Sequence, residues 1–293
     1  MLLLRRAVAC LRRGGHRVGL LAPRGPGSTL IGSGAGEAQE LLSWEAAETV
    51  QLFTEDGALG PLRGRLAAFD AAIAYTRSAD LARGLRAAIP RVLVHDPMPP
   101  PGGGHVAEWL ARPATLLGVS CAEAPPTLRP TSEEREQAAA VLAEMPARFL
   151  AVHPGSGSPD KNWQAARFAS LLDALGAERF LLVEGPADAD VAVALRARGG
   201  ATTARGLPAR VLGAALARAA AYVGNDSGVT HLAAAWDAPT VALYGPTDPG
   251  VWSPVGPRVA IVRSSGPSME GIAVETVAAA VAPFLEGGPV GPR

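Results

Sequence analysis

Three turns in the second half of the sequence carry polar residue types that could bind a ligand: two suit a negatively charged phosphate group, and one suits sugar hydroxyl groups. The first is the run HPGSGSPDK, from His153 to Lys161, which follows a short apolar stretch. A loop rich in glycine and serine exposes backbone N–H groups, and the start of a following helix adds partial positive charge; both attract phosphate. An ordinary glycine-rich turn is the alternative, and the spacing differs from that of a Walker loop.

Lys161 strengthens the phosphate interpretation of this loop. It is the only lysine among the 27 basic residues of the chain, because arginine fills every other basic position. An ammonium group is a compact point charge on a flexible stem, whereas a guanidinium group is a rigid planar fork. The placement of the single lysine in this loop therefore indicates a specific role for its charge.

The second turn, from Glu184 to Asp190, is acidic. Acidic groups at the carboxyl end of a parallel strand can accept hydrogen bonds from the hydroxyl groups of a ribose. Asp188 is the candidate for that role. The alternative is that Asp188 and Asp190 cap the helix that follows, and one residue can do both.

The third turn, GNDSGVTH, runs from Gly224 to His231 and opens a helix of small residues. The first N–H groups of that helix point toward the same edge as the other two turns, so Gly228 and its neighbours add to the phosphate site. Asp226 and Ser227 are also natural helix caps, which is the alternative. His231 lies about one turn into the helix, where an imidazole can reach a phosphate, although a lone helical histidine often serves a structural hydrogen bond.

A parallel sheet is needed to bring these turns together. Short β-type runs alternate with alanine-rich helical stretches, which predicts the α/β class, with parallel strands covered on both faces. Loops at the carboxyl ends of such strands gather on one edge, so the three turns should converge. In the second half we predict strands at 149–153, 179–184, 221–224, 240–244 and 259–262, and helices at 164–175, 189–198, 209–219, 230–236 and 275–284.

The pattern of the first half of the sequence also predicts an alternation of strands and helices. The run DPMPPPGGG is too rich in proline and glycine for regular structure. The segment PPTLRP is the best linker, and Thr131 or Ser132 caps the helix after it, so we expect two domains, 1–128 and 129–293. Strands are predicted at 16–22, 71–75 and 91–94, a helix-to-strand passage at 46–53, and helices at 81–88 and from 106.

Composition narrows the class of protein. The 293 residues include 27 basic and 27 acidic side chains, and this balance argues against a nucleic-acid partner. Charged residues interrupt every apolar run before about 18 residues, so no transmembrane helix is expected. Cys10 and Cys121 lie far apart in the sequence, so we expect no disulfide framework and predict a reducing, cytoplasmic location.

The sequence resembles glycosyltransferase family 9, the lipopolysaccharide heptosyltransferases. The resemblance rests on the runs HPGSGSPDKNW, GNDSGVTHLAAA and LYGPTDP, followed by MEGIAVETV, in the family's order across residues 145–285. It continues more weakly into the first half, where the run from His105 to Glu108 resembles an H-x-x-E motif of the family.

The resemblance implies the GT-B architecture, in which two Rossmann-like domains face each other across a cleft. It implies transfer of a heptose from ADP-heptose to a lipid-linked glycan, the lipopolysaccharide core, with inversion and without a metal or other cofactor. The first domain would take the acceptor and the second the nucleotide-sugar donor. The protein would be cytoplasmic, with peripheral contact at the inner membrane.

The matching motif positions also imply roles for individual residues. Ser156 and Lys161 would contact the diphosphate, and Asp188 would approach the ribose of the adenosine. Further contacts to the diphosphate or the sugar would come from the third turn, through Asp226, Ser227, Gly228 and His231.

The start of the chain departs from the family pattern. Family members begin with a strand and an L-G-D-x-x-x-T-x-P turn, whose aspartate is the proposed general base, and no Gly-Asp pair occurs here before residue 50. We therefore expect a relative that lacks the first strand and this turn, through truncation or a start codon assigned too late. His105, Asp96 and His95, beside the proline- and glycine-rich run, are the remaining candidates for the base.

Two other interpretations are compatible with parts of the pattern, and a third is disfavoured. A relative that binds a nucleotide-sugar without catalysis would keep the phosphate-binding turns and lack the base. An epimerase or a transferase with UDP or GDP donors would share the GT-B architecture. A dinucleotide-dependent oxidoreductase is disfavoured, because no G-x-G-x-x-G motif follows the early strand.

Overall fold

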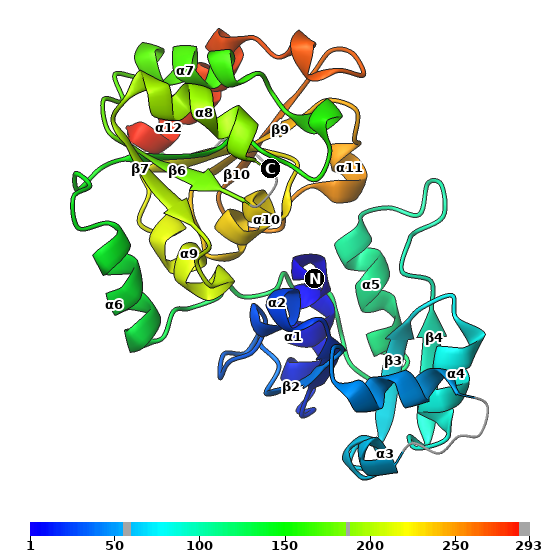
Figure 1. Cartoon of the computed structure of the whole chain (residues 1–293). Coiled ribbons are helices and arrows are strands. Elements are labelled where there is room, and N and C mark those ends of the chain that lie inside the picture. Colours follow the sequence, from blue (N-terminus) through cyan, green and yellow to red (C-terminus); the bar gives the residue numbers. More distant parts are fainter. Residues whose placement is uncertain (55–59, 186–187, 287–293) are drawn as a thin grey trace. The chain divides into compact units, whose positions relative to one another are not determined.

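The computed structural model describes residues 1–54, 60–185 and 188–286. The chain divides into two compact units, Leu3–Pro126 and Thr127–Arg293, which we call unit 1 and unit 2 (Figure 1). Each unit combines parallel strands with helices, which confirms the predicted α/β class. Among the described helices, none has the length and apolar character needed to cross a bilayer.

Unit 2 is built on a six-stranded parallel sheet with the order β10-β9-β8-β5-β6-β7. From β5 the chain winds outward through β6 and β7, and it then returns to β8 and winds the opposite way through β9 and β10. The order therefore reverses between β5 and β8, which lie side by side in the middle of the sheet. The strands are β5 (Leu150–His153), β6 (Phe180–Glu184), β7 (Ala201–Arg205), β8 (Ala221–Asn225), β9 (Thr240–Tyr244) and β10 (Val259–Arg263).

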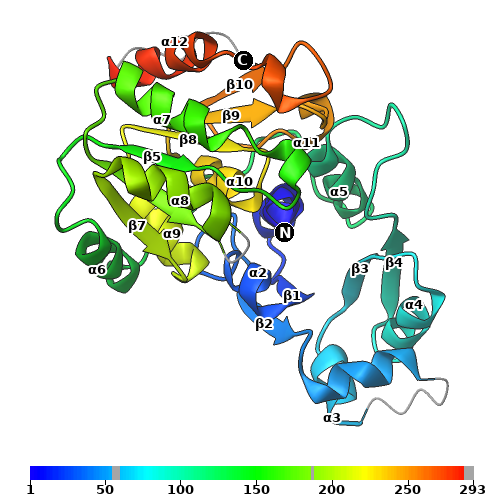
Figure 2. The ribbon, with the colours of Figure 1, turned by 45° about the horizontal axis from the view of Figure 1, so that its top comes forward.

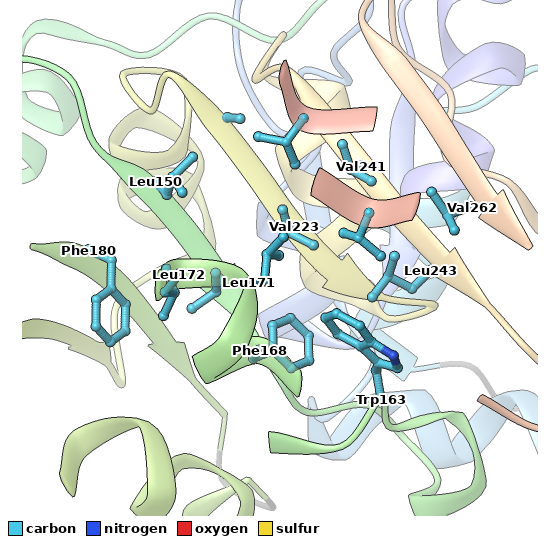
Figure 3. Packing of buried hydrophobic residues seen from close by; sticks show 14 of the residues in the cluster. Leu150, Trp163, Phe168, Leu171, Leu172, Phe180, Val223, Val241, Leu243 and Val262 are labelled. Carbon is cyan, nitrogen blue, oxygen red and sulfur yellow. The ribbon is translucent and has the colours of Figure 1, made fainter. Parts of the chain in front are cut away.

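Helices cover both faces of this sheet, as Figures 1 and 2 show. Because the central strands are buried on both faces, they carry near-continuous apolar runs, as parallel strands usually do. Their side chains form one core with apolar side chains of α7, α8 and α12, among them Phe168, and with Trp163 from the loop before α7 (Figure 3). The helices are α6 (Ser132–Val141), α7 (Ala165–Ala174), α8 (Ala189–Arg198), α9 (Ala209–Leu216), α10 (Gly228–Ala235), α11 (Pro249–Trp252) and α12 (Val274–Leu285), with short 3-10 turns η3 (Pro159–Lys161) and η4 (Met269–Gly271).

The start of α6 confirms the predicted helix cap after the linker. The hydroxyl of Thr131 accepts the N–H of Glu134, and the Glu134 carboxylate accepts the N–H of Thr131 at 2.8 Å. This reciprocal pair satisfies two N–H groups that a helix start would otherwise leave open. Glu134 also pairs with Arg210 of α9 at 2.6 Å, so the cap joins the two helices.

Unit 1 holds two separate parallel pairs of strands among its described residues, β1 with β2 and β3 with β4. Helices α1 and α5 pack together, and buried side chains of both form a cluster with Ile73 of β3. The elements are η1 (Leu2–Leu4), α1 (Arg5–Arg13), β1 (Gly19–Ala22), α2 (Arg24–Ser28), β2 (Glu40–Ser43), η2 (Ala47–Phe53), α3 (Gly60–Leu66), β3 (Ala71–Tyr75), α4 (Ala79–Arg86), β4 (Arg91–His95) and α5 (Val106–Thr115).

Several elements differ from the sequence prediction. The passage at 46–53 is a 3-10 turn with no strand, and the strand predicted from residue 16 begins only at Gly19. The prediction missed β2 and β7. The sequence of β7, ATTAR, lies at the edge of the sheet and is half-exposed, so it lacks the apolar run by which a buried strand is recognised.

The expectation that the chain has no disulfide was wrong. A disulfide joins Cys10 of α1 to Cys121, and their Cα atoms are 5.1 Å apart. Separation along the chain says nothing about distance in the fold, and α5 returns the chain to the side of α1 just before Cys121. The bridge therefore closes a loop that contains nearly all of unit 1.

Candidate functional site

The first and third predicted turns meet at the carboxyl ends of neighbouring strands. His153, the last residue of β5, is the register partner of Gly224 in β8. The strand order reverses between these two strands, and doubly wound sheets bind their ligands at such a reversal. We refer to the two turns and the loop after β9 as the switch-point cluster.

Lys161 and Asp226 form the centre of the switch-point cluster. The Lys161 Nζ lies 3.2 Å from the Asp226 Oδ2, which also accepts the hydroxyl of Thr247 at 2.9 Å. The side chain of Lys161 is 23% exposed and that of Asp226 is 11% exposed. An ammonium group has three N–H donors, so one ion pair leaves donors that can reach an incoming anion.

The start of α10 places Ser227, Gly228 and His231 beside Asp226. Ser227 is the N-cap of this helix, because its hydroxyl accepts the N–H of Thr230, as the capping alternative predicted. Gly228 is exposed, and a Cβ added there would meet open space. His231 is half-buried one turn into the helix. Asp226, in contrast, is held by Lys161 and Thr247 and does not cap the helix.

Ser156 uses its hydroxyl within its own loop. The Ser156 Oγ donates to the Ser158 carbonyl at 2.6 Å and accepts the Ser158 N–H at 3.2 Å. This local turn shapes the loop that leads through η3 to Lys161. The structure therefore places Ser156 in the same loop as Lys161, where it supports the loop's conformation.

Asp188 is buried and faces inward. Its Oδ2 accepts the N–H of Gly185 at 2.8 Å, and its side chain is only 7% exposed. It also fills the space beside Gly155, where an added Cβ would lie 1.9 Å from the Asp188 Oδ1. Asp188 stands at the N-cap position of α8, but its side chain makes no capping hydrogen bond there, and its contact with a ribose stays a prediction. Residues 186 and 187 of this turn lie outside the described residues.

His153 is the first residue of the switch-point cluster and is almost fully buried. Its Nδ1 is 3.1 Å from the Val183 carbonyl and 3.7 Å from the Asp188 Oδ2. Burial lowers the pKa of the imidazole, and the carbonyl and the carboxylate oppose this change. The folded state therefore resists protonation of His153 more than the unfolded chain does.

A pH dependence of stability follows from His153. As pH falls below about 6.5, His153 in the unfolded chain takes up a proton while the buried imidazole resists it. The free energy of unfolding of unit 2 should therefore decrease from near-neutral pH toward pH 5. Urea unfolding at several pH values measures this decrease, and His153→Asn, which has no group that titrates there, should flatten it. An equally steep decrease in that variant would assign it to other groups.

Two candidate bases from unit 1 are held in local contacts. Asp96 forms two hydrogen bonds with the Arg77 guanidinium, at 2.9 and 3.0 Å, and these lower the pKa of its carboxyl group. His95, the last residue of β4, packs on the Trp109 ring, and its Nε2 is 3.0 Å from the Trp109 carbonyl. Burial is the largest influence on His95 and lowers its pKa.

His105 is the N-cap of α5. Its Nδ1 accepts the N–H of Ala107 at 3.1 Å. This contact fixes the imidazole at the start of α5, beside the proline- and glycine-rich run.

Two residues of the cluster were not singled out in the sequence. Thr247 belongs to the proline- and glycine-rich loop after β9 and helps to hold Asp226. Asn225 ends β8, is fully buried and binds the backbone of Pro154 and of Trp163, one on each side of Lys161. The sequence signal that could have identified Asn225 is its polar side chain at the end of an otherwise apolar strand. Within the described ranges, no group of three or more histidine, cysteine, aspartate or glutamate side chains is placed to hold a metal ion.

The sequence matches known glycosyltransferases. The sequence profile of glycosyltransferase family 9 (heptosyltransferase) matches residues 82–278. Lipopolysaccharide heptosyltransferase 3 of Escherichia coli is 30% identical over 162 residues, which are 52% of this chain and 48% of that protein. The chain thus matches about half the length of this curated relative.

Two solved structures share the fold over nearly the whole chain. The glycosyl transferase family 9 protein of Veillonella parvula superposes with a TM-score of 0.79 at 19% identity, covering 98% of this chain and 94% of the other. ADP-heptose LPS heptosyltransferase II of E. coli gives 0.77 at 19% identity, covering 97% and 95%. These likenesses confirm the predicted GT-B fold class, and the profile match shows that the chain belongs to glycosyltransferase family 9, the heptosyltransferases.

Proposed function

We propose that this protein transfers a heptose or a related sugar from an ADP-sugar to a lipopolysaccharide-core or similar glycan acceptor, with inversion and without a metal ion. The observation that carries the proposal is the switch-point cluster, in which the sole lysine of the chain meets Asp226 and the start of α10. Unit 2 would bind the nucleotide-sugar, and unit 1 would receive the acceptor.

The chemistry of the cluster suits the departure of a diphosphate. Breaking the bond between the sugar and the diphosphate builds negative charge on the phosphate oxygens. Lys161 supplies a full positive charge, and the first N–H groups of α10 supply partial positive charge, so both stabilise that transition state. His231 lies one turn into the same helix, and its imidazole would donate a further hydrogen bond to the diphosphate from the side of α10.

Asp226 sets the orientation of the lysine before the donor arrives. Thr247 donates to the same carboxylate oxygen as Lys161, so the carboxylate is fixed between two partners. A cation held by a fixed carboxylate loses less conformational freedom on binding a ligand than a free lysine would. This preorganisation supports a binding role for the ion pair rather than a purely structural one.

The acceptor in this proposal is lipid-linked, so the protein would act at the cytoplasmic face of the inner membrane, in peripheral contact with it. The acceptor hydroxyl must lose a proton as it attacks, because its own pKa is far above neutral. The hydrogen bonds from Arg77 lower the pKa of Asp96 and make it a weaker base, and His105 stays a candidate for the group that takes this proton.

A transfer assay tests the proposal directly. The protein is incubated with radiolabelled ADP-heptose and a purified core acceptor, with and without EDTA, and the product's anomeric configuration is read by NMR. We expect transfer with inversion that EDTA leaves unchanged, and competition by ADP but not by UDP or GDP. Binding of ADP without transfer would overturn the transferase assignment, and preference for UDP or GDP would overturn the donor.

A further inference from the structure

One buried side chain fixes both ends of the loop that carries Lys161. Asn225 is fully buried at the end of β8. Its Oδ1 accepts the backbone N–H of Trp163 at 3.0 Å, and its Nδ2 donates to the carbonyl of Pro154 at 2.8 Å. Pro154 and Trp163 are the two ends of the glycine- and serine-rich loop, so a single amide clamps that loop against β8.

The clamp requires a primary amide of this length. An amide side chain has both an acceptor and a donor, and each is used here by a backbone group of the opposite kind. An aspartate at residue 225 has nearly the same shape but only acceptors, so it would keep the bond to Trp163 and face the carbonyl of Pro154 with a carboxylate. In a buried site, such a loss of one donor is costly because the carbonyl is left without a partner.

The far end of the loop is anchored independently of Asn225. The indole N–H of Trp163 donates to the carbonyl of Ile272 at 3.0 Å, and the ring is fully buried against Phe168. Trp163 is therefore fixed in the core, and the amide of Asn225 sets the position of the loop relative to β8. Lys161 lies two residues before Trp163, and Asp226 directly follows Asn225 in the chain.

We propose that Asn225 is a positioning residue that holds the ammonium group of Lys161 at the diphosphate-binding turn. The inference rests on the proposed function, because it concerns the placement of the cation that would bind the donor's diphosphate. Asn225 does not touch that ligand in the proposal; it acts through the loop. Its effect on binding should therefore depend on the presence of Lys161.

A double-mutant cycle separates this role from a general structural one. ADP binding is measured by calorimetry for the wild type, Asn225→Asp, Lys161→Ala and the double variant. We expect Asn225→Asp to weaken ADP binding roughly tenfold when Lys161 is present and much less when it is absent. Equal weakening in both backgrounds would show that Asn225 does not act through Lys161 and would overturn the proposal.

A matched control and a second measurement keep the outcome clear. Leu195→Ala removes a buried core side chain from α8 and should lower stability while ADP affinity stays within twofold of the wild type. Hydrogen exchange of the backbone amides of 155–163 should be faster in Asn225→Asp than in Leu195→Ala. Unchanged exchange would overturn the clamp itself. If the wild-type protein does not bind ADP, the proposed function fails, and the exchange experiment still decides whether Asn225 fixes the loop.

Discussion

Replacing Lys161 with alanine should weaken ADP binding roughly tenfold to a hundredfold, and sugar transfer should fall by at least as much. A charge-assisted hydrogen bond contributes about 1.5–3 kcal/mol, which corresponds to that range. The transition state carries more charge on the leaving diphosphate than the bound donor does, so the rate should suffer more than the affinity. Calorimetry with ADP and steady-state transfer kinetics measure the two effects.

The companion variants show whether the effect belongs to the charge. Lys161→Gln keeps an N–H donor for Asp226 and guards against a simple folding failure, yet it should bind ADP nearly as poorly as the alanine variant. Lys161→Arg should recover only part of the affinity, because a planar guanidinium does not present its donors as an ammonium does. Arg218→Ala removes an equal charge from an exposed residue at the opposite, amino-end edge of the sheet, and it should bind ADP normally. Wild-type affinity in Lys161→Ala would contradict the phosphate site.

Reducing the disulfide between Cys10 and Cys121 should destabilise unit 1 by about 2–5 kcal/mol. The bridge spans a sequence separation of 111, and cross-links that close long loops restrict the unfolded chain most. Cys10 is fully buried in the cluster that joins α1 to α5, so the reduced thiol stays in an apolar site. Hydrogen exchange followed by mass spectrometry, with and without a dithiol reductant, measures the loss in unit 1.

Unit 2 is the internal control for the disulfide. The sequence has two cysteines, and both precede residue 127, so exchange in unit 2 should be unchanged by the reductant. A Cys10→Ala and Cys121→Ser double variant should reproduce the reduced state without any reductant. Equal exchange in unit 1 before and after reduction would show that the bridge does not contribute to stability.

The contacts of α1 on either side of Cys10 indicate where the loss of stability in unit 1 should begin. Arg6 and Arg13 lie one turn before and one turn after Cys10 on the helix, and both donate to the backbone near Cys121. Arg6 binds the carbonyl of Cys121 at 3.0 Å, and Arg13 binds that of Glu123 at 3.2 Å. Amides of residues 118–124 should therefore be the first in unit 1 to exchange faster on reduction.

The turns of the site could be predicted from the sequence because unusual residue types mark them. A lone lysine, clustered glycines and a run of small residues at a helix start are all local signals, and the structure brings the first and third turns together at neighbouring strands. The second turn was harder to interpret. Asp188 has the residue type of a ribose ligand, but its exposure depends on the packing around Gly155, which no local pattern shows.

The features that the sequence did not show depend on contacts between distant residues. In the sequence, Asn225 is only the residue directly after a predicted strand. Its two hydrogen bonds to the loop 154–163 depend on the packing of that loop beside β8. The pairing of Cys10 with Cys121 depends on how α1 packs on α5. Strand β7 is visible mainly through its ladder with β6, because an exposed edge strand needs few apolar residues.

The segment that joins the two units is tied down at both of its ends. On one side, a guanidinium nitrogen of Arg13 binds the carbonyl of Ala124; on the other, the N–H of Leu128 binds the carbonyl of Ala235. Residues 125–127 lie between these ties, and two of them are prolines, whose rings fix φ. The connecting segment therefore has only three residues between its two anchors, and the backbone of two of them has little freedom in φ.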